Sequence, residues 1–231
     1  MTSSPPSKLP ATVGELLRRR LREIKRTQEE LAEAIEVPTE YIDDLIEGSR
    51  RPPLPGRTDI YEKMTSFLRL GRNDVVTCAR AERASTPPTG TGPGADVRRM
   101  MFDLCDPRSA KELERRRARR GGAEELASVM QRVLDVAQGA VRRVLDDRIG
   151  LRLAAAERGS TYVAMRLRVL EFLDATPDTL TAQDLTEFLR PRIARWNMDL
   201  ETGVLRVVLR EHEPRPRERR TAVKVTAPDL G

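Results

Sequence analysis

Aromatic residues are scarce in this sequence: one Trp, three Tyr and four Phe make up 3% of its 231 residues. This scarcity disfavours a large β-sandwich, whose strands are enriched in aromatic side chains. The hydrophobic fraction of 39% still suffices to bury a core at this length. Leu, Val, Ile, Met and Ala must therefore supply that core, which predicts a mainly α fold.

Long hydrophobic runs are also missing. No apolar stretch approaches the roughly 20 residues that cross a bilayer. The first 11 residues contain Pro and Ser in place of the hydrophobic run of a secretory signal. We expect a cytoplasmic protein that has no membrane partner.

Groups that carry common enzyme chemistry are few. Cys78 and Cys105 are too few for a disulfide framework or a zinc site, and His212 is the single histidine. The glycine-dense segment 89–94 lies among prolines, not between a strand and a helix, so it does not form a phosphate loop. We expect no metal, no cofactor and no enzymatic activity, and an unrecognised enzyme in the second half is the remaining alternative.

Negative charge is outweighed by arginine. The net charge is +6, and only five of the 42 basic residues are lysine. Such a balance points to a polyanionic partner, and arginine enrichment can also follow from a GC-rich genome. Up to residue 85 the chain has 15 basic and 14 acidic residues, so most of the excess lies later, notably at 115–120 and 214–220. Runs of this kind are also typical of solvated faces.

Composition breaks divide the chain into four parts. Residues 1–11 should be a disordered tail and residues 85–95, rich in Pro and Gly, a linker. Between them, residues 12–84 have a dense helical pattern. Residues 96–231 should form an α-rich domain that dimerises or senses a signal.

The second domain shows five helical signals before a strand pattern. We expect helices over 96–104, 109–120, 123–148, 162–174 and 181–189, with Ser109 and Glu112 forming a capping box at the second. The longest helix has one continuous apolar stripe: Leu126, Val129, Met130, Val133, Ala137, Val141, Val144, Leu145 and Ile149. Such a stripe needs a partner helix, which predicts a homodimer. Alternation at 194–201 and 204–209 predicts a hairpin, and 221–226 could add a third strand.

Residues 13–52 predict three short helices. Thr27 and Glu30 are placed as a capping box before the second helix, and Gly48 ends the third. Each helix has an inward apolar face: Val13, Leu16, Leu17, Leu21 and Ile24; then Leu31, Ala32 and Ile35; then Ile42, Leu45 and Ile46. The second and third helices, joined by a tight turn, predict a helix-turn-helix.

The segment ThrGlnGluGluLeuAla at 27–32, together with Arg22, the turn residue Val37, Ile42 and the ending 48–52, resembles the lambda-repressor/Cro-like (Xre-type) helix-turn-helix family. The resemblance covers residues 13–70, about a quarter of the chain. It implies a five-helix DNA-binding domain, which fits further helices at 59–70 and 74–83.

The resemblance also implies that the partner is double-stranded DNA, and it implies which residues meet that DNA. By position, Gln28 would contact a phosphate or a base edge, and Arg50 and Arg51 would grip the backbone. The exposed face of the recognition helix would consist of Thr39, Glu40, Tyr41, Asp43 and Asp44.

Four acidic residues distinguish this recognition helix from its relatives, which usually have Ser, Arg, Lys, Asn or Gln there. They are Glu40, Asp43, Asp44 and Glu47. Acids can accept a hydrogen bond from cytosine but are repelled by phosphate. Two functions therefore stay open: a dimeric DNA-binding transcriptional regulator, or an adaptor whose acidic third helix binds a basic partner protein.

Overall fold

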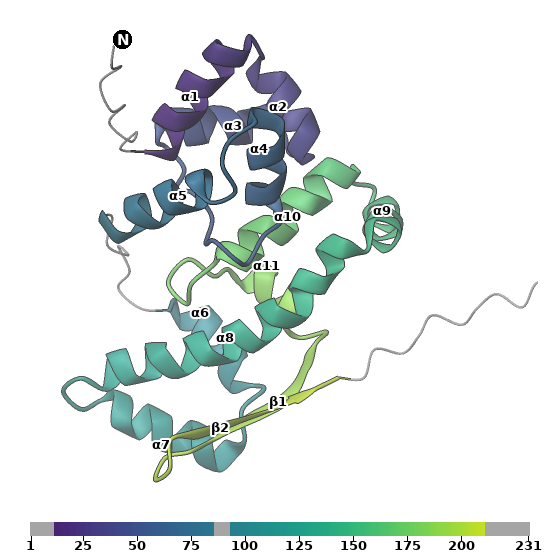
Figure 1. Cartoon of the computed structure of the whole chain (residues 1–231). Helices are drawn as coiled ribbons and strands as arrows, with labels where there is room; N and C mark the ends of the chain where they lie inside the picture. The colour runs from purple at the N-terminus through teal and green to yellow at the C-terminus, as the bar shows by residue number, and fades with distance from the viewer. Residues whose placement is uncertain (1–11, 86–92, 211–231) are drawn as a thin grey trace, which may run out of the picture.

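The computed structural model describes residues 12–85 and 93–210, and the chain is mainly helical throughout these ranges (Figure 1). The first range holds α1 (Val13–Ile24), α2 (Gln28–Ile35), α3 (Thr39–Glu47), α4 (Ile60–Leu68) and α5 (Asp74–Ser85). The second holds α6 (Ala95–Phe102), α7 (Pro107–Arg117), α8 (Gly122–Asp146), α9 (Arg148–Glu157), α10 (Tyr162–Asp174), α11 (Ala182–Asp184), the π-helical turn η1 (Leu185–Leu189), and strands β1 (Ile193–Asp199) and β2 (Val204–Leu209). The predicted mainly α class with a small terminal hairpin is confirmed.

Capping residues determine where α2 begins and where α3 ends. The Thr27 hydroxyl accepts from the backbone N–H of Glu30 at 3.2 Å, and the Glu30 carboxylate accepts from the backbone N–H of Thr27 at 2.9 Å. This is the predicted capping box. Gly48, at φ 80°, ends α3 in the left-handed conformation that glycine adopts without steric cost.

A close helix crossing fixes α1 against α3. A Cβ at Gly14 would lie 2.5 Å from the backbone oxygen of Leu45 and 2.7 Å from that of Ile46. Only glycine allows this approach, so α3 is held directly on α1 and its outward side is defined by that contact.

The long helix α8 is the centre of the second half. Its apolar stripe is buried against other elements of the same chain, chiefly α7, α9, α10 and η1. The inference that this stripe needs a second chain was therefore wrong, because the partner helices lie in the same chain. Ile149 is not part of the stripe: α8 ends at Asp146, and Ile149 lies 75% exposed on α9.

Two helix boundaries differ from the predictions. Helix α7 begins at Pro107, since the Asp106 carboxylate caps it by accepting from the backbone N–H groups of Arg108 and Ser109. The Ser109 hydroxyl instead donates to the Met198 carbonyl at 3.2 Å. Helix α9 was not predicted, because only Asp147 separates it from α8; this residue caps α9 through the N–H of Gly150 at 2.8 Å.

Strands β1 and β2 form the predicted antiparallel hairpin, with Trp196 opposite Val207 and Met198 opposite Leu205. Trp196 is fully buried, and its indole N–H donates to the Met101 carbonyl at 2.9 Å, which attaches the hairpin to α6. The predicted third strand at 221–226, the tail 1–11 and linker residues 86–92 lie outside the described residues.

Candidate nucleic-acid interface

Helices α2 and α3 are joined by a three-residue turn with a fixed geometry. Glu36 has a left-handed backbone at φ 60°, and the N–H of Val37 donates to the Ala32 carbonyl at 3.0 Å. Val37, Ile35 and Ile42 are buried beside the turn. The turn therefore holds α3 rigidly relative to α2.

The predicted contact residues of these helices lie in different environments. Gln28 is the first residue of α2 and half-buried, as are Thr39, Asp43 and Asp44, whereas Glu40 is exposed. The prediction that Tyr41 is exposed was wrong: its side chain is 4% exposed, because the Arg50 guanidinium lies 4.9 Å above its ring and α10 lies alongside. Burial raises the pKa of Tyr41 well above its ordinary value.

The loop that follows α3, residues 48–59, is turned toward the second half of the chain. Arg50 lies between two carboxylates, 3.4 Å from Asp44 and 3.4 Å from Glu171 of α10. Arg51 donates to the Arg83 carbonyl at 2.8 Å. Both predicted phosphate-binding arginines thus make contacts within the chain.

Further contacts continue along the same loop. The Arg57 guanidinium lies 2.6 Å from the Asp135 carboxylate of α8 and also donates to the Gln138 side chain. Asp174, at the end of α10, accepts from the Leu54 backbone N–H at 2.8 Å and from Arg83 at 2.9 Å. Burial raises the pKa of Asp174 above its ordinary value despite the nearby Arg83.

A buried ion cluster anchors the other end of α10 to the α2–α3 turn. Arg166 is completely buried, and its guanidinium lies 2.6 Å from Asp59 and 3.8 Å from Glu36. Lys63 contacts both carboxylates, at 3.0 and 2.6 Å respectively. Burial acts to raise the pKa of Asp59, but Arg166 and Lys63 outweigh it and hold that pKa below its ordinary range. Burial also acts to raise the pKa of Glu36, but Lys63, the Tyr162 hydroxyl and Arg148 together hold it below its ordinary range.

Helix α1 presents basic residues on the other side of α3. The Arg18 guanidinium donates to the Ile46 carbonyl at 3.0 Å, so this part of α1 adjoins the end of α3. Arg18, Arg22 and Lys25 are all exposed. These three residues recur at spacings of four and three, so they share one face and form a positive rim beside the end of α3.

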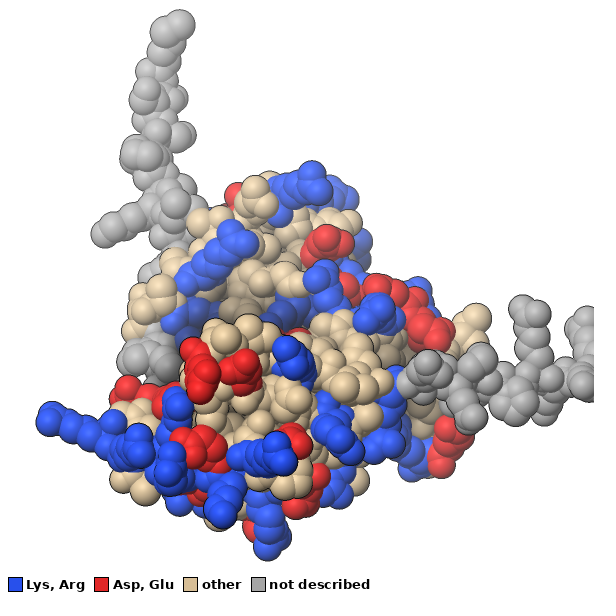
Figure 2. All heavy atoms as spheres, turned by 90° about the horizontal axis from the view of Figure 1, so that it is seen from below, with Lys and Arg blue, Asp and Glu red and all other residues tan. Residues whose placement is uncertain are grey.

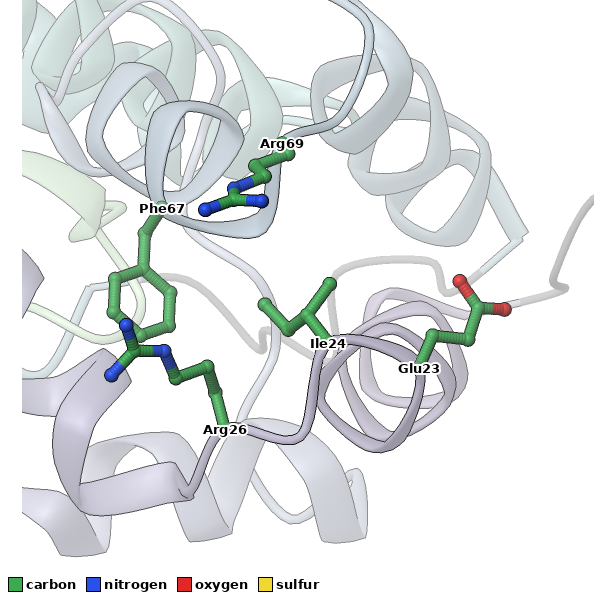
Figure 3. A pocket seen from close by; sticks show the side chains of 5 residues that line it. All are labelled: Glu23, Ile24, Arg26, Phe67 and Arg69. Carbon is green, nitrogen blue, oxygen red and sulfur yellow. The ribbon is translucent and has the colours of Figure 1, made fainter.

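A hollow of about 350 Å³ extends this rim near the start of α2. Arg26 and Arg69 flank it, Ile24 and Phe67 form its apolar wall, and Glu23 points away from the other four side chains (Figure 3). Two guanidinium groups beside an aromatic ring can bind an anion, and an anion here would share Arg26 with the Glu30 carboxylate, which lies 2.5 Å from it.

On the face seen in Figure 2, the described basic residues do not gather into one surface, and the predicted basic run 214–220 lies outside the described residues. Figure 2 shows basic and acidic side chains interspersed on the face seen from below. In the predicted cluster 115–120, Arg115 and Arg116 pair with Glu112, and Arg117 pairs with Glu114. This run is a solvated face with internal ion pairs.

The described residues offer little for metal or thiol chemistry. Within them no three His, Cys, Asp or Glu side chains are grouped as metal ligands. Burial raises the pKa of Cys78 to about 11 and that of Cys105 to about 12, so both thiols stay protonated at neutral pH. Across the described ranges no helix combines the length and the apolar character needed to cross a bilayer.

Sequence reasoning missed the residues of α10. One signal was present: Arg166 interrupts a row of α10 residues that is otherwise apolar at helical spacing, namely Tyr162, Val169, Leu170 and Leu173. An arginine in such a row indicates a buried ion pair. No comparable pattern marks Glu171 or Asp174, whose role depends on tertiary contacts.

Comparisons with protein-family models, with curated proteins and with solved structures find no match for this chain. No family assignment follows, and the function proposed below rests on the residues described above.

Proposed function

We propose that this chain is a cytoplasmic DNA-binding transcriptional regulator, with α2 and α3 acting as a helix-turn-helix of the Xre type. The observation that carries the proposal is this helix pair: helices of 8 and 9 residues, locked by a capping box and a left-handed turn residue. The five helices α1–α5 also fit the bundle that the resemblance implies. In such a domain α3 enters the major groove and the start of α2 meets the backbone.

The charge around α3 supports phosphate contacts on one side. Arg18, Arg22 and Lys25 of α1 are exposed beside α3, and the Arg26 and Arg69 hollow lies next to the start of α2. Arginine and lysine contacts to phosphate position a protein on DNA without reading its sequence. The basic rim of α1 is accordingly the proposed backbone-binding surface.

A homodimer remains part of the proposal, because two recognition helices one DNA turn apart give affinity that a single short helix lacks. The α8 stripe no longer argues for it, since it is buried within the chain. Light scattering of the full chain, alone and with duplex DNA, tests this point: a monomer in both conditions contradicts the dimer.

Fluorescence anisotropy with labelled random-sequence duplexes at two salt concentrations tests DNA binding. We expect affinity to fall steeply with salt, because arginine-to-phosphate contacts release counterions. Glu40→Gln removes one negative charge from the exposed side of α3 and should tighten binding. Glu124→Gln makes the same change at the exposed start of α8 and serves as the matched control. Absent binding, or equal effects from both variants, contradicts the proposal.

The second candidate is a protein-docking adaptor. Glu40 and Glu47 are exposed on α3, and the loop arginines Arg50 and Arg57 already pair with carboxylates of the same chain. That side of α3 is therefore acidic, which favours this candidate. An adaptor of this kind would bind arginine-rich peptides and not duplex DNA. The same anisotropy assay with a labelled poly-arginine peptide distinguishes the two candidates, with Glu40→Gln weakening peptide binding but tightening DNA binding.

A further inference from the structure

Helix α10 covers one edge of α3 and of the loop 48–59. Tyr41 of α3 is buried there beneath Arg50, and Arg50 in turn contacts Glu171 of α10 at 3.4 Å. In Figure 1, α10 runs below α4 and above α8. The covered edge is the one on which the loop arginines lie.

Three carboxylates of the second half contact donors of this edge. We name Asp135, Glu171 and Asp174 the acidic row. Asp135 pairs with Arg57 at 2.6 Å and Glu171 with Arg50 at 3.4 Å. Asp174 accepts from the Leu54 backbone N–H at 2.8 Å and from Arg83 at 2.9 Å.

The donors in these contacts are the kind that bind a DNA backbone. Guanidinium groups donate to phosphate oxygens in the same geometry in which they donate to carboxylates. The Leu54 backbone N–H is not counted among these phosphate donors and reports only whether the row is closed. Each carboxylate of the row therefore occupies a donor that could otherwise bind a phosphate. One set of donors cannot serve both anions at once.

We propose that the acidic row is an internal phosphate mimic that competes with DNA for the loop 48–59. This inference rests on the proposed DNA-binding function and adds its regulation. This arrangement is the DNA-excluding form, and DNA binding on the loop side requires the loop 48–59 to separate from α10 and from Asp135 of α8. The basic rim of α1 stays available in both forms and supplies a first, weaker contact.

Two of the three ion pairs of the acidic row are partly exposed, so the row can separate from the loop 48–59. Arg50 and Glu171 are about one-third exposed, at 31% and 33%, and Arg57 and Asp135 are 26% and 45% exposed, whereas Arg83 and Asp174 are more deeply buried, at 12% and 27%. Exposed ion pairs are weak individually and are screened by salt. The buried Arg166 contact with Asp59, by contrast, ties the start of α10 to the first half. The acidic row can thus open while α10 stays attached near the α2–α3 turn.

Hydrogen exchange of the unmodified full chain is the first arm of the test. The Leu54 N–H reports directly on the row because Asp174 accepts its hydrogen bond. We expect exchange at Leu54 to accelerate when a random-sequence duplex is added. If DNA binds and Leu54 stays as protected as before, the competition is overturned while the DNA-binding function stands.

A charge-neutralising variant is the second arm. Glu171→Gln with Asp135→Asn removes two charges of the row and keeps side-chain size. Glu124→Gln with Asp96→Asn makes the same change at exposed positions of α8 and α6 and is the matched control. We expect the row variant to exchange faster at Leu54 without DNA, and to bind DNA roughly tenfold more tightly than the control, because more molecules are competent to bind.

The outcomes separate the two proposals. Faster exchange in the row variant combined with tighter DNA binding supports the phosphate mimic. Equal DNA affinity of the row variant and the control overturns it, because total charge then accounts for any gain. If no form of the chain binds DNA while Leu54 exchange accelerates in the row variant, the DNA-binding function itself fails and the competition fails with it.

Discussion

The Asp59–Arg166 ion pair should be a main support of the contact between the two halves. Arg166 is 0% exposed, and its guanidinium contacts Asp59 at 2.6 Å, the Ile35 carbonyl at 3.4 Å and Glu36 at 3.8 Å. Asp59→Asn keeps the shape of the side chain and removes its charge. The buried guanidinium then retains only the more distant Glu36 as a counter-charge.

The expected loss of unfolding free energy depends on the charge that stays buried, which is that of Arg166. Removing one member of a buried ion pair costs about 3–5 kcal/mol, because the other charge is left uncompensated. Asp59 is 26% exposed and Glu36 remains nearby, so we expect the lower end, about 3 kcal/mol of unfolding free energy. For a chain of this size that loss lowers the melting temperature by roughly 6–12 °C.

Calorimetry and urea titration of three variants measure this loss. Asp103→Asn breaks the exposed pair with Arg190 and should cost less than about 1 kcal/mol, which makes it the matched control. Arg166→Met added to Asp59→Asn removes the stranded charge and should recover at least half of the loss. If Asp59→Asn costs no more than Asp103→Asn, the buried pair does not hold the two halves together.

The pH dependence gives an independent check with a defined sign. Burial acts to raise the pKa of Asp59, but Arg166 and Lys63 outweigh it and the folded-state pKa is lowered. The stability gained from ionised Asp59 is therefore complete above the ordinary carboxyl pKa, about 3.9, and is lost as the pH falls through the lower folded value. The difference between the unmodified chain and Asp59→Asn should be constant near neutral pH and shrink only in acid.

Three further predictions concern other parts of the chain. Asp174, whose pKa is raised by burial, should behave with the opposite sign: the unmodified chain should gain stability relative to Asp174→Asn as the pH falls from neutral toward about 4, measured by urea titration across pH. Gly14→Ala should cost more than about 2 kcal/mol, because its Cβ would lie 2.5 Å from a backbone oxygen of α3; a melting temperature equal to that of the unmodified chain would contradict the close crossing. Cys78 and Cys105 are buried with raised pKa values, so both should react with iodoacetamide far more slowly in the native chain than in urea, and equal rates would contradict this.

Local chemistry made much of the fold predictable. The capping box of Thr27 and Glu30 and the bounds of α10 depend on residues adjacent in sequence, and both predictions were confirmed. The break between α8 and α9 was not predictable from periodicity, because the single residue Asp147 separates two helical patterns. The α8 stripe correctly indicated a packed face, but a stripe does not say whether its partner lies in the same chain.

The candidate interface was less predictable because its environment is tertiary. Position in the α3 pattern placed Tyr41 on the exposed face, yet contacts with Arg50 and with α10 bury it. Arg50 follows α3 as the resemblance implies, but Glu171 lies 121 positions further along the chain, and no spacing rule connects them. The sequence therefore located the helices of the interface but not the helix that covers it.

The contacts of Asp44 show that the acidic residues of α3 do not all have the same role. Its carboxylate accepts from the Ser49 hydroxyl at 3.1 Å and lies 3.4 Å from Arg50, so this acid orients an arginine of the loop. If α10 separates, Arg50 loses Glu171 but keeps Asp44 and the face of Tyr41, and remains positioned for a phosphate. Among the described contacts, neither Glu40 nor Glu47 orients an arginine, and both side chains are exposed. Three of the four acids of α3 therefore differ in role under the proposed function: Asp44 supports a basic group, whereas Glu40 and Glu47 would repel phosphate. Neutralising Glu40 and neutralising the acidic row accordingly test different steps of the proposed binding reaction.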